Sequence, residues 1–176
     1  MSYEEVILVD AKNREIGTME KLEAHEKGVL HRAFSIFIFN DLGEMLIQRR
    51  ALEKYHCPGM WSNACCSHPR KDEAQVEALT RKMVQEMGFT VPVEKAFDFT
   101  YRAELDNGLI EYEFDEVYVG NYEGHVNPNP EEVCEYRYES IENIRRQIQQ
   151  NPSNFTPWFR LLFEPIVKHY SLLRRA

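Results

Sequence analysis

The chain has 176 residues and a net charge of −8, with 43% hydrophobic and 28% charged residues. A chain of this length buries an adequate core without disulfides or metals, which indicates one domain over residues 1–176, and its negative charge disfavours a nucleic-acid partner. No apolar run approaches the roughly 18 residues that span a membrane, and the N-terminus lacks a secretory pattern, so we expect a soluble cytoplasmic protein.

Two hairpins are predicted in the first 50 residues. Residues 4–9 and 14–19 flank Asp-Ala-Lys-Asn, a pattern typical of two strands joined by a turn. Residues 33–40 and 44–49 are rich in aromatic and branched side chains on either side of Asp-Leu-Gly, which predicts a second hairpin. The end of this hairpin is expected to deliver Arg49 and Arg50 into a loop.

The principal helix is predicted over residues 72–87, where apolar residues recur mostly three or four positions apart and Gly88 provides a stop. Strands are predicted at 96–104 and 110–119, with Asp-Asn-Gly at 106–108 as the turn between them. An amphipathic stretch over 140–149 and a segment after Thr156-Pro157 predict two further helices. Strands flanked by helices indicate an α/β or α+β sandwich.

A metal site is one hypothesis for the polar side chains of this sequence. The histidines that lie near other polar groups are His25, His31 and His68, whereas His56, His125 and His169 lack such company. Glu111 and Glu113 are two residues apart on a predicted strand and therefore share one face, although a solvent-facing strand is the ordinary alternative. Imidazoles with carboxylates suit Mn²⁺, Fe²⁺ or Zn²⁺, and an all-oxygen set would suit Mg²⁺.

Residues 62–69, Ser-Asn-Ala-Cys-Cys-Ser-His-Pro, predict a small polar loop with Cys66 two residues before His68. A cysteine in this position is either an inert thiol or an acid–base group, and the spacing alone does not decide between them. No two cysteines have the Cys-x-x-Cys spacing of a zinc or redox site, so all four are expected to be free thiols in a reducing cytoplasm.

The longer segment 58–69, Pro-Gly-Met-Trp-Ser-Asn-Ala-Cys-Cys-Ser-His-Pro, resembles the cysteine loop of type 1 isopentenyl-diphosphate isomerases. Further segments agree with this family in order and spacing, at residues 21–34, 49–54, 101–103, 111–113 and 155–158. The resemblance implies a Nudix-like sandwich of mixed β-sheet flanked by helices. It also implies a monomer or homodimer that converts isopentenyl diphosphate to dimethylallyl diphosphate by adding and removing protons at the alkene.

The resemblance further implies roles for individual residues. Cys66 and Glu113 are implied to be the acid–base pair, with Tyr101 assisting the glutamate, and Cys65 is implied to pack. A divalent metal, Mn²⁺ or else Zn²⁺ or Mg²⁺, is implied at His25, His31, His68, Glu111 and Glu113. A Mg²⁺ that accompanies the substrate diphosphate is implied at Glu86 and the Cys66 backbone. The implied substrate contacts are Lys21, Arg50, Lys54 and Lys82 for the diphosphate and Trp158 for transient positive charge.

Two other functions stay open. Related hydrolases carry the Nudix box at the predicted principal helix, but this chain has Lys82 and Gln85 at two of its acidic positions and Ser67 at its first glycine. A pyrophosphohydrolase of a nucleotide derivative would use those acids to gather Mg²⁺, so this alternative is disfavoured. A non-catalytic metal- or diphosphate-binding module is the second alternative, and it would need neither Cys66 nor Glu113.

Overall fold

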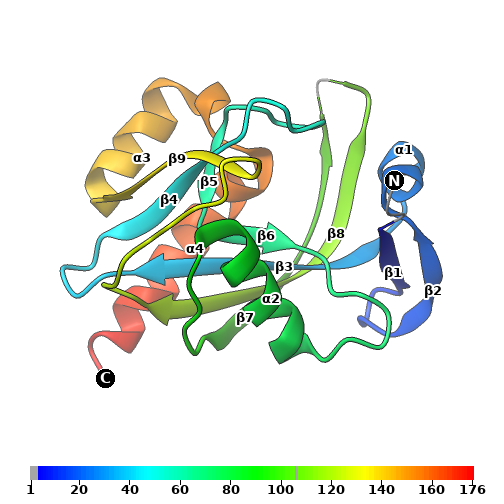
Figure 1. The fold of residues 1–176 in the computed structure, drawn as a ribbon, viewed down its shortest axis with the longest axis horizontal. Helices are drawn as coiled ribbons and strands as arrows, with labels where there is room; N and C mark the ends of the chain where they lie inside the picture. Colours follow the sequence, from blue (N-terminus) through cyan, green and yellow to red (C-terminus); the bar gives the residue numbers. More distant parts are fainter. Residues whose placement is uncertain (1–3, 106) are drawn as a thin grey trace.

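A computed structural model describes residues 4–105 and 107–176. Its elements in chain order (Figure 1) are β1 (Glu5–Val9), β2 (Glu15–Glu20), α1 (Lys21–Lys27), β3 (His31–Phe39), β4 (Met45–Arg50), β5 (Trp61–Asn63), β6 (Cys65–Ser67), α2 (Gln75–Met87), β7 (Glu94–Glu104), β8 (Ile110–Asn121), β9 (Val133–Glu139), α3 (Ile141–Gln150), a short 3₁₀ helix (Pro152–Asn154) and α4 (Pro157–Leu173).

A mixed sheet forms the centre of the molecule, and β3 is its central strand. β3 pairs in parallel with β8 and antiparallel with β1, β4 and β6. Nearly every residue of β3 is buried, as expected of a strand that is covered on both faces.

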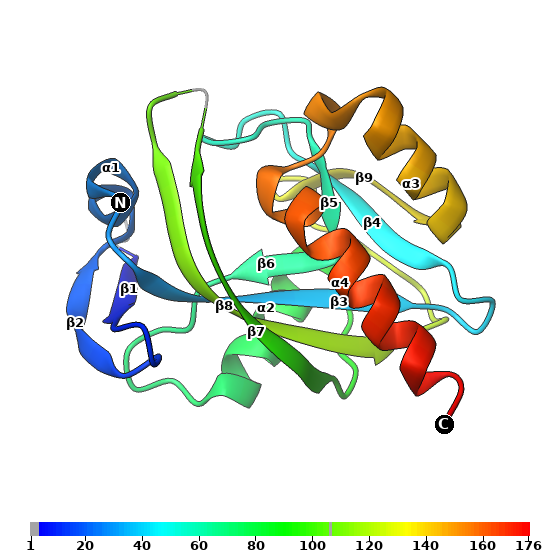
Figure 2. The same cartoon turned by 180° about the vertical axis from the view of Figure 1, so that it is seen from behind.

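The two faces of β3 pack against different helices, as Figures 1 and 2 show from opposite sides. Phe37 and Phe39 pack in a cluster with α4, whereas Phe34, Ile36 and Ile38 pack in a second cluster with α2. Successive side chains on a strand point to opposite faces, so the aromatic and branched residues of β3 fill both layers. The predicted sandwich of mixed sheet and helices is confirmed.

Helix ends follow local signals, with one difference from the prediction. α2 begins at Gln75 rather than at residue 72, because Asp72 has a left-handed φ of 61° and Ala74 is extended. It ends at Gly88 (φ 73°), where a β-carbon would lie 2.3 Å from the Asn127 carbonyl oxygen, so glycine is required there.

The three predicted hairpins are confirmed, as β1–β2, β3–β4 and β7–β8. The predicted loop around Cys66 is wrong, because residues 61–63 and 65–67 form β5 and β6. The prediction that Arg50 lies in a loop is also wrong, because β4 extends through Arg50. Two further elements, α1 and β9, were not predicted from the sequence. Of the predicted 106–108 turn, Asp106 lies outside the described residues, as do residues 1–3 of the N-terminus.

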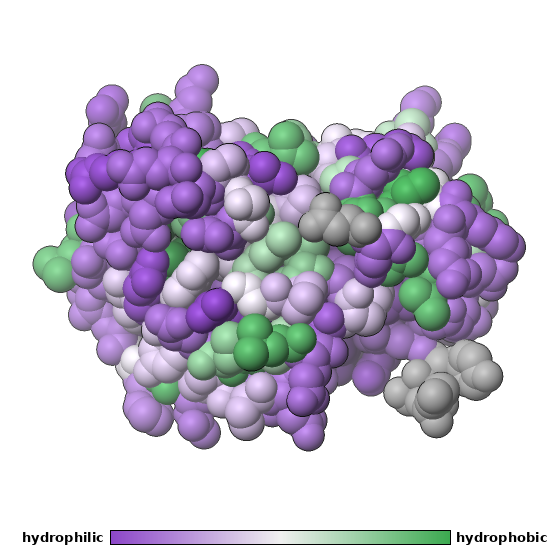
Figure 3. All heavy atoms as spheres, turned by 90° about the horizontal axis from the view of Figure 1, so that it is seen from above, coloured by the Kyte–Doolittle hydropathy of each residue, from purple (hydrophilic) through white to green (hydrophobic). Residues whose placement is uncertain are grey.

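The surface seen from above is mainly hydrophilic, with hydrophobic residues in small patches (Figure 3). None of the helices described here is long and apolar enough to cross a membrane. Within residues 4–105 and 107–176, Cys65, Cys66 and Cys134 are free thiols, as predicted.

Candidate active site

A small chamber lies beside the central strand, with a volume of about 70 Å³. Most of the residues singled out from the sequence line it: Lys21, Arg50, Lys54, Cys66, His68, Lys82, Glu86, Tyr101, Glu111, Glu113 and Trp158. They come from α1, α2, α4 and four strands, as well as from the segments between these elements. The fold thus brings together side chains that are up to 137 positions apart, from Lys21 to Trp158.

Three neighbouring strands place the Glu113 carboxylate. Glu113 on β8 stands opposite Tyr101 on β7 and beside His31 on β3. The Tyr101 hydroxyl donates to Glu113 Oε2 at 2.7 Å, while Glu113 Oε1 lies 3.0 Å from His68 Nε2 and 3.5 Å from His31 Nε2. The two oxygens of this carboxylate therefore face different groups, one the tyrosine and the other the histidines.

His25, His31, His68 and Glu113 form a buried cluster whose possible ligand atoms all lie within 4.8 Å of one another. α1 ends at Gly28 in the left-handed conformation (φ 60°), and β3 begins three residues later, which brings His25 and His31 together. The ring centroids of these two histidines are 5.0 Å apart.

The backbone orients two of these imidazoles toward the centre of the cluster. His25 Nδ1 lies 2.6 Å from the Lys21 carbonyl oxygen and His31 Nδ1 lies 2.8 Å from that of Val29. A carbonyl oxygen only accepts, so Nδ1 carries the hydrogen and Nε2 presents a lone pair. Both Nε2 atoms are buried with no hydrogen-bond partner among the described residues.

This donor set fits a divalent metal. Carbonyl-anchored histidines with unpartnered nitrogens are the usual arrangement of metal ligands. Metal–ligand bonds of about 2.1 Å would separate neighbouring ligand atoms by roughly 3.0–3.4 Å, close to the 3.0 and 3.5 Å from Glu113 Oε1 to His68 and His31.

The charges of this cluster are set by burial and by mutual contacts. Burial lowers the pKa of His25 and lowers that of His68 to about 3. Burial alone would raise the pKa of Glu113, but its close contacts with His31 and His68 outweigh burial and hold this pKa well below its ordinary value. The same contact with Glu113 outweighs burial at His31 and raises its pKa. The cluster thus combines an anionic carboxylate with two imidazoles, His25 and His68, whose neutral form is favoured by burial.

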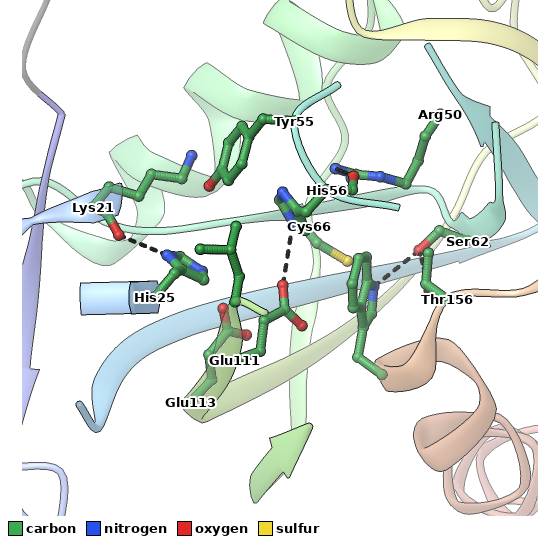
Figure 4. Close-up of polar contacts among 12 residues, drawn as sticks. Lys21, His25, Arg50, Tyr55, His56, Ser62, Cys66, Glu111, Glu113 and Thr156 are labelled. Atoms are coloured by element: carbon green, nitrogen blue, oxygen red, sulfur yellow. Dashed lines mark hydrogen bonds and ion pairs between the residues drawn. The ribbon is translucent and has the colours of Figure 1, made fainter. Parts of the chain in front are cut away.

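Glu111, the fifth predicted ligand, lies next to this cluster rather than within it. Its Oε2 lies 3.0 Å from the Tyr101 hydroxyl oxygen, and its Oε1 lies 3.2 Å from His56 Nε2. Burial and the charge of Glu113 raise the pKa of Glu111 to about 8. The expectation that His56 has no polar company is wrong, because the segment between β4 and β5 folds back over the chamber (Figure 4).

Cys66 reaches the chamber from β6, on the other side of β3 from Glu113. Its thiol donates to Asn63 Oδ1 at 3.0 Å and lies 3.6 Å from the Ser35 hydroxyl. Burial, together with the nearby Asp115 carboxyl, raises the pKa of the Cys66 thiol. Its neighbour Cys65 is fully buried in the cluster beneath α2.

Four cations line the chamber, namely Lys21, Arg50, Lys54 and Lys82. The three lysines pair with carboxylates: Lys21 with Glu4 at 2.9 Å, Lys54 with Glu132, and Lys82 with Glu86 at 3.1 Å. These lysines also border a second, larger cavity of about 620 Å³ that Arg70 and Lys71 help to line. A cationic vestibule therefore adjoins the small chamber.

Trp158, in the first turn of α4, forms another wall of the chamber. Its indole nitrogen donates to the Ser62 hydroxyl at 2.9 Å, and the Arg50 guanidinium lies 5.4 Å from the ring centroid. The hydrogen bond to Ser62 fixes the orientation of the ring.

Comparisons with known proteins identify the family. The NUDIX domain model matches residues 29–159. An isopentenyl-diphosphate Delta-isomerase from Pectobacterium atrosepticum is 44% identical over 99% of this chain and 97% of its own length. The chain belongs to the isopentenyl-diphosphate Delta-isomerase family. A second member of this family, from Burkholderia multivorans, is 45% identical over 92% of both chains.

Solved Nudix structures share the fold with this isomerase-family chain. The MutT protein from Methanosarcina mazei superimposes with a TM-score of 0.66 at 21% identity, covering 80% of this chain and 95% of its own. A MutT NUDIX hydrolase from Burkholderia pseudomallei gives 0.61 at 17% identity, covering 77% of this chain and 96% of its own. At these identities the likeness concerns the fold alone.

The isomerase-family chain departs from a hydrolase at the Nudix box. Lys82, at an acidic position of the box, points its ammonium group at Glu86 Oε1, 3.1 Å away. Glu73 is held by Arg81, with 2.6 Å between Oε1 and Nε. Both surviving carboxylates therefore already have cationic partners.

Proposed function

We propose that this protein converts isopentenyl diphosphate to dimethylallyl diphosphate and that one Nudix-like domain carries the whole activity. The observation that supports this most strongly is that Cys66 and Glu113 reach a single small chamber from opposite sides of β3, next to a cluster of cations. The substrate alkene must gain a proton at its terminal carbon and lose one from C2. Such a reaction needs two acid–base groups that approach from different directions.

In the proposed mechanism the hydrocarbon occupies the chamber between Cys66 and Glu113. One of these groups delivers a proton to the alkene and the other removes a proton from C2. The Oε2 atom of Glu113 is the one that faces Tyr101, so the tyrosine hydroxyl orients this oxygen by donating a hydrogen bond to it. The nearby Trp158 face would stabilise transient positive charge by about 1–2 kcal/mol.

A divalent metal, for which we propose Mn²⁺ or alternatively Zn²⁺ or Mg²⁺, would be held by His25, His31, His68 and Glu113, with Glu111 as the adjoining ligand. Bound there, it would supply positive charge that tunes the acidity of Glu113. The protein's own contribution is the orientation of the donors, through the Lys21 and Val29 carbonyls and the Tyr101 hydroxyl.

The diphosphate is proposed to lie where the chamber adjoins the vestibule, so that its oxygens would contact Lys21, Arg50, Lys54 and Lys82. Charge-assisted contacts to phosphate are strong, and they would replace the ion pairs that the lysines now make with acids. We propose that the accompanying Mg²⁺ is held at Glu86 and the Cys66 backbone. The protein is proposed to act in the cytoplasm on this small molecule, as a monomer or homodimer.

The function is tested by mixing the metal-loaded protein with isopentenyl diphosphate and following the carbon and phosphorus signals by NMR. We expect dimethylallyl signals to appear while the diphosphate stays intact. A parallel sample with a nucleoside diphosphate derivative tests the hydrolase alternative. The proposal would be contradicted if the protein released phosphate from either compound and left the alkene of isopentenyl diphosphate in place.

A further inference from the structure

The segment between β4 and β5, residues 51–60, forms the roof of the chamber. Tyr55 and His56 of this roof segment both line the chamber, and Figure 4 shows their side chains across from Glu111 and Glu113. The His56 side chain is only 10% exposed although it belongs to a connecting segment. Such burial is unusual for a surface connection, so the ring has a defined place in the site.

Three contacts from three different elements hold the roof segment down. His56 Nε2 lies 3.2 Å from Glu111 Oε1, on β8. Arg50, at the end of β4, donates to the His56 carbonyl oxygen at 3.1 Å. Asn107, in the turn that follows β7, donates to the Tyr55 carbonyl oxygen at 2.8 Å. The His56 ring is therefore fixed by its own side chain and by the backbone on either side of it.

The His56 ring fills the space above the proposed alkene position. Its ring centroid lies 4.5 Å from the ring centroid of Tyr55, 6.0 Å from that of Trp158 and 5.8 Å from that of His25. It thus spans the gap between the indole wall and the histidine cluster. A side chain with no ring at this position would leave that gap open.

The chamber is closely matched to a small hydrocarbon. Its volume is about 70 Å³, and a water-sized group needs roughly 10–15 Å³ of such space. A chamber of this size admits only a short hydrocarbon, and the isopentenyl group has five carbons. The diphosphate has further room in the adjoining 620 Å³ vestibule, whereas Tyr55 and His56 of the roof line only the chamber.

We propose that His56 is a specificity-determining residue, whose ring closes the chamber so that a five-carbon branched homoallylic diphosphate is accepted and larger homologues are rejected. This inference rests on the proposed isomerase function. Tyr55 completes the roof, and Glu111, Arg50 and Asn107 act as positioning residues through their contacts with the roof segment.

The test uses 3-ethylbut-3-enyl diphosphate, the homologue with an ethyl group in place of the methyl branch. Its isomerisation adds a proton to the terminal CH₂ carbon and removes one from C2, giving 3-methylpent-2-enyl diphosphate without a co-reactant. The quantity measured is kcat/KM for this homologue divided by kcat/KM for isopentenyl diphosphate. One methylene in a tight pocket is worth about 10- to 200-fold, so we expect His56→Ala to raise this ratio about tenfold or more.

Matched variants separate ring size from hydrogen bonding. His56→Phe keeps a ring of similar size but has no nitrogen for Glu111, and it should keep the ratio near that of the unmodified protein. His125→Ala changes an exposed histidine outside the chamber and should leave the ratio unchanged. His56→Ser provides a second small side chain, which should raise the ratio as His56→Ala does.

The inference is overturned if folded His56→Ala and His56→Ser proteins isomerise isopentenyl diphosphate with an unchanged ratio, or if His56→Phe raises the ratio as much as they do. Failure of the proposed function would look different, because the unmodified protein would then not isomerise isopentenyl diphosphate at all.

Discussion

The Cys66 thiol donates to the side-chain oxygen of Asn63 across 3.0 Å, and the amide of Asn63 cannot turn away from it. The Asn63 nitrogen donates to two backbone carbonyl oxygens, those of Ile36 at 3.1 Å and Cys65 at 2.9 Å. A flipped amide would lose both bonds, so its oxygen stays directed at the sulfur. The neighbouring Cys65 points to the other face of β6 and packs beneath α2.

These opposite orientations predict different effects for the two adjacent cysteines. Cys66→Ala should lower the isomerisation rate about 100- to 10,000-fold, the usual contribution of an acid–base group, whereas Cys65→Ala should retain most of the rate. The rates are measured by NMR with isopentenyl diphosphate, and thermal unfolding monitors the fold of both variants. Equal losses in the two variants would contradict the assignment of Cys66.

Glu113→Gln tests proton transfer separately from metal binding. The amide keeps an oxygen toward His68 and His31 but cannot carry a proton at neutral pH. We expect a loss of about 100-fold or more in protein that elemental analysis shows to be loaded with metal. An undiminished rate in that loaded variant would rule out Glu113 as the proton carrier.

Metal affinity should depend on the clustered histidines and on pH. Single replacement of His25, His31 or His68 by alanine should weaken binding about tenfold or more in a chelator competition, whereas His125→Ala and His169→Ala should leave it unchanged. An imidazole must be neutral to coordinate, and Glu113 raises the pKa of His31 above the ordinary value of about 6.5, so binding should weaken as the pH falls from neutral through that value.

The chelator also gives a control for this metal prediction. Removing the metal should stop the reaction without unfolding the protein, because the two clusters on either side of the sheet supply the core. The prediction fails if metal-free protein works at the full rate or if His125→Ala and His169→Ala weaken binding as much as the cluster variants.

The free energy of unfolding of the metal-free protein should decrease as the pH is lowered, partly because of His56. Burial and the charge of Arg50 lower the pKa of His56 to about 3, against roughly 6.5 in the unfolded chain. Between these values the unfolded state binds a proton that the folded state does not, so the free energy of unfolding decreases as the pH falls. In urea titrations from pH 7 to pH 4, His56→Gln should show a shallower decrease. Equal slopes for the two proteins would contradict this account.

Local patterns in the sequence were enough for the elements that depend on neighbouring residues. Gly88 ends α2 where its backbone conformation requires, and the two-residue spacing of Glu111 and Glu113 places both on one face of β8. The start of α2 was misplaced because Asp72 adopts a left-handed conformation that the apolar spacing does not reveal.

The features that sequence analysis missed depend on distant partners. The three-residue strand β6 exists through its pairing with Phe34–Ile36 of β3, and no local pattern in a Cys-Cys-Ser segment predicts that pairing. His56 meets Glu111 because the roof segment is tied down by Arg50 and Asn107. The only local signal for His56 was its position six residues after Arg50, which is too weak to assign a contact.

Cys66 and Glu113 are proposed to move the double bond by adding one proton and removing another. Running the reaction in D₂O and locating deuterium in the product by NMR follows the added proton itself. We expect dimethylallyl diphosphate with deuterium in the methyl group formed from the terminal alkene carbon and with the diphosphate intact. Product that carries no solvent deuterium in that methyl group, or release of phosphate in its place, would contradict it.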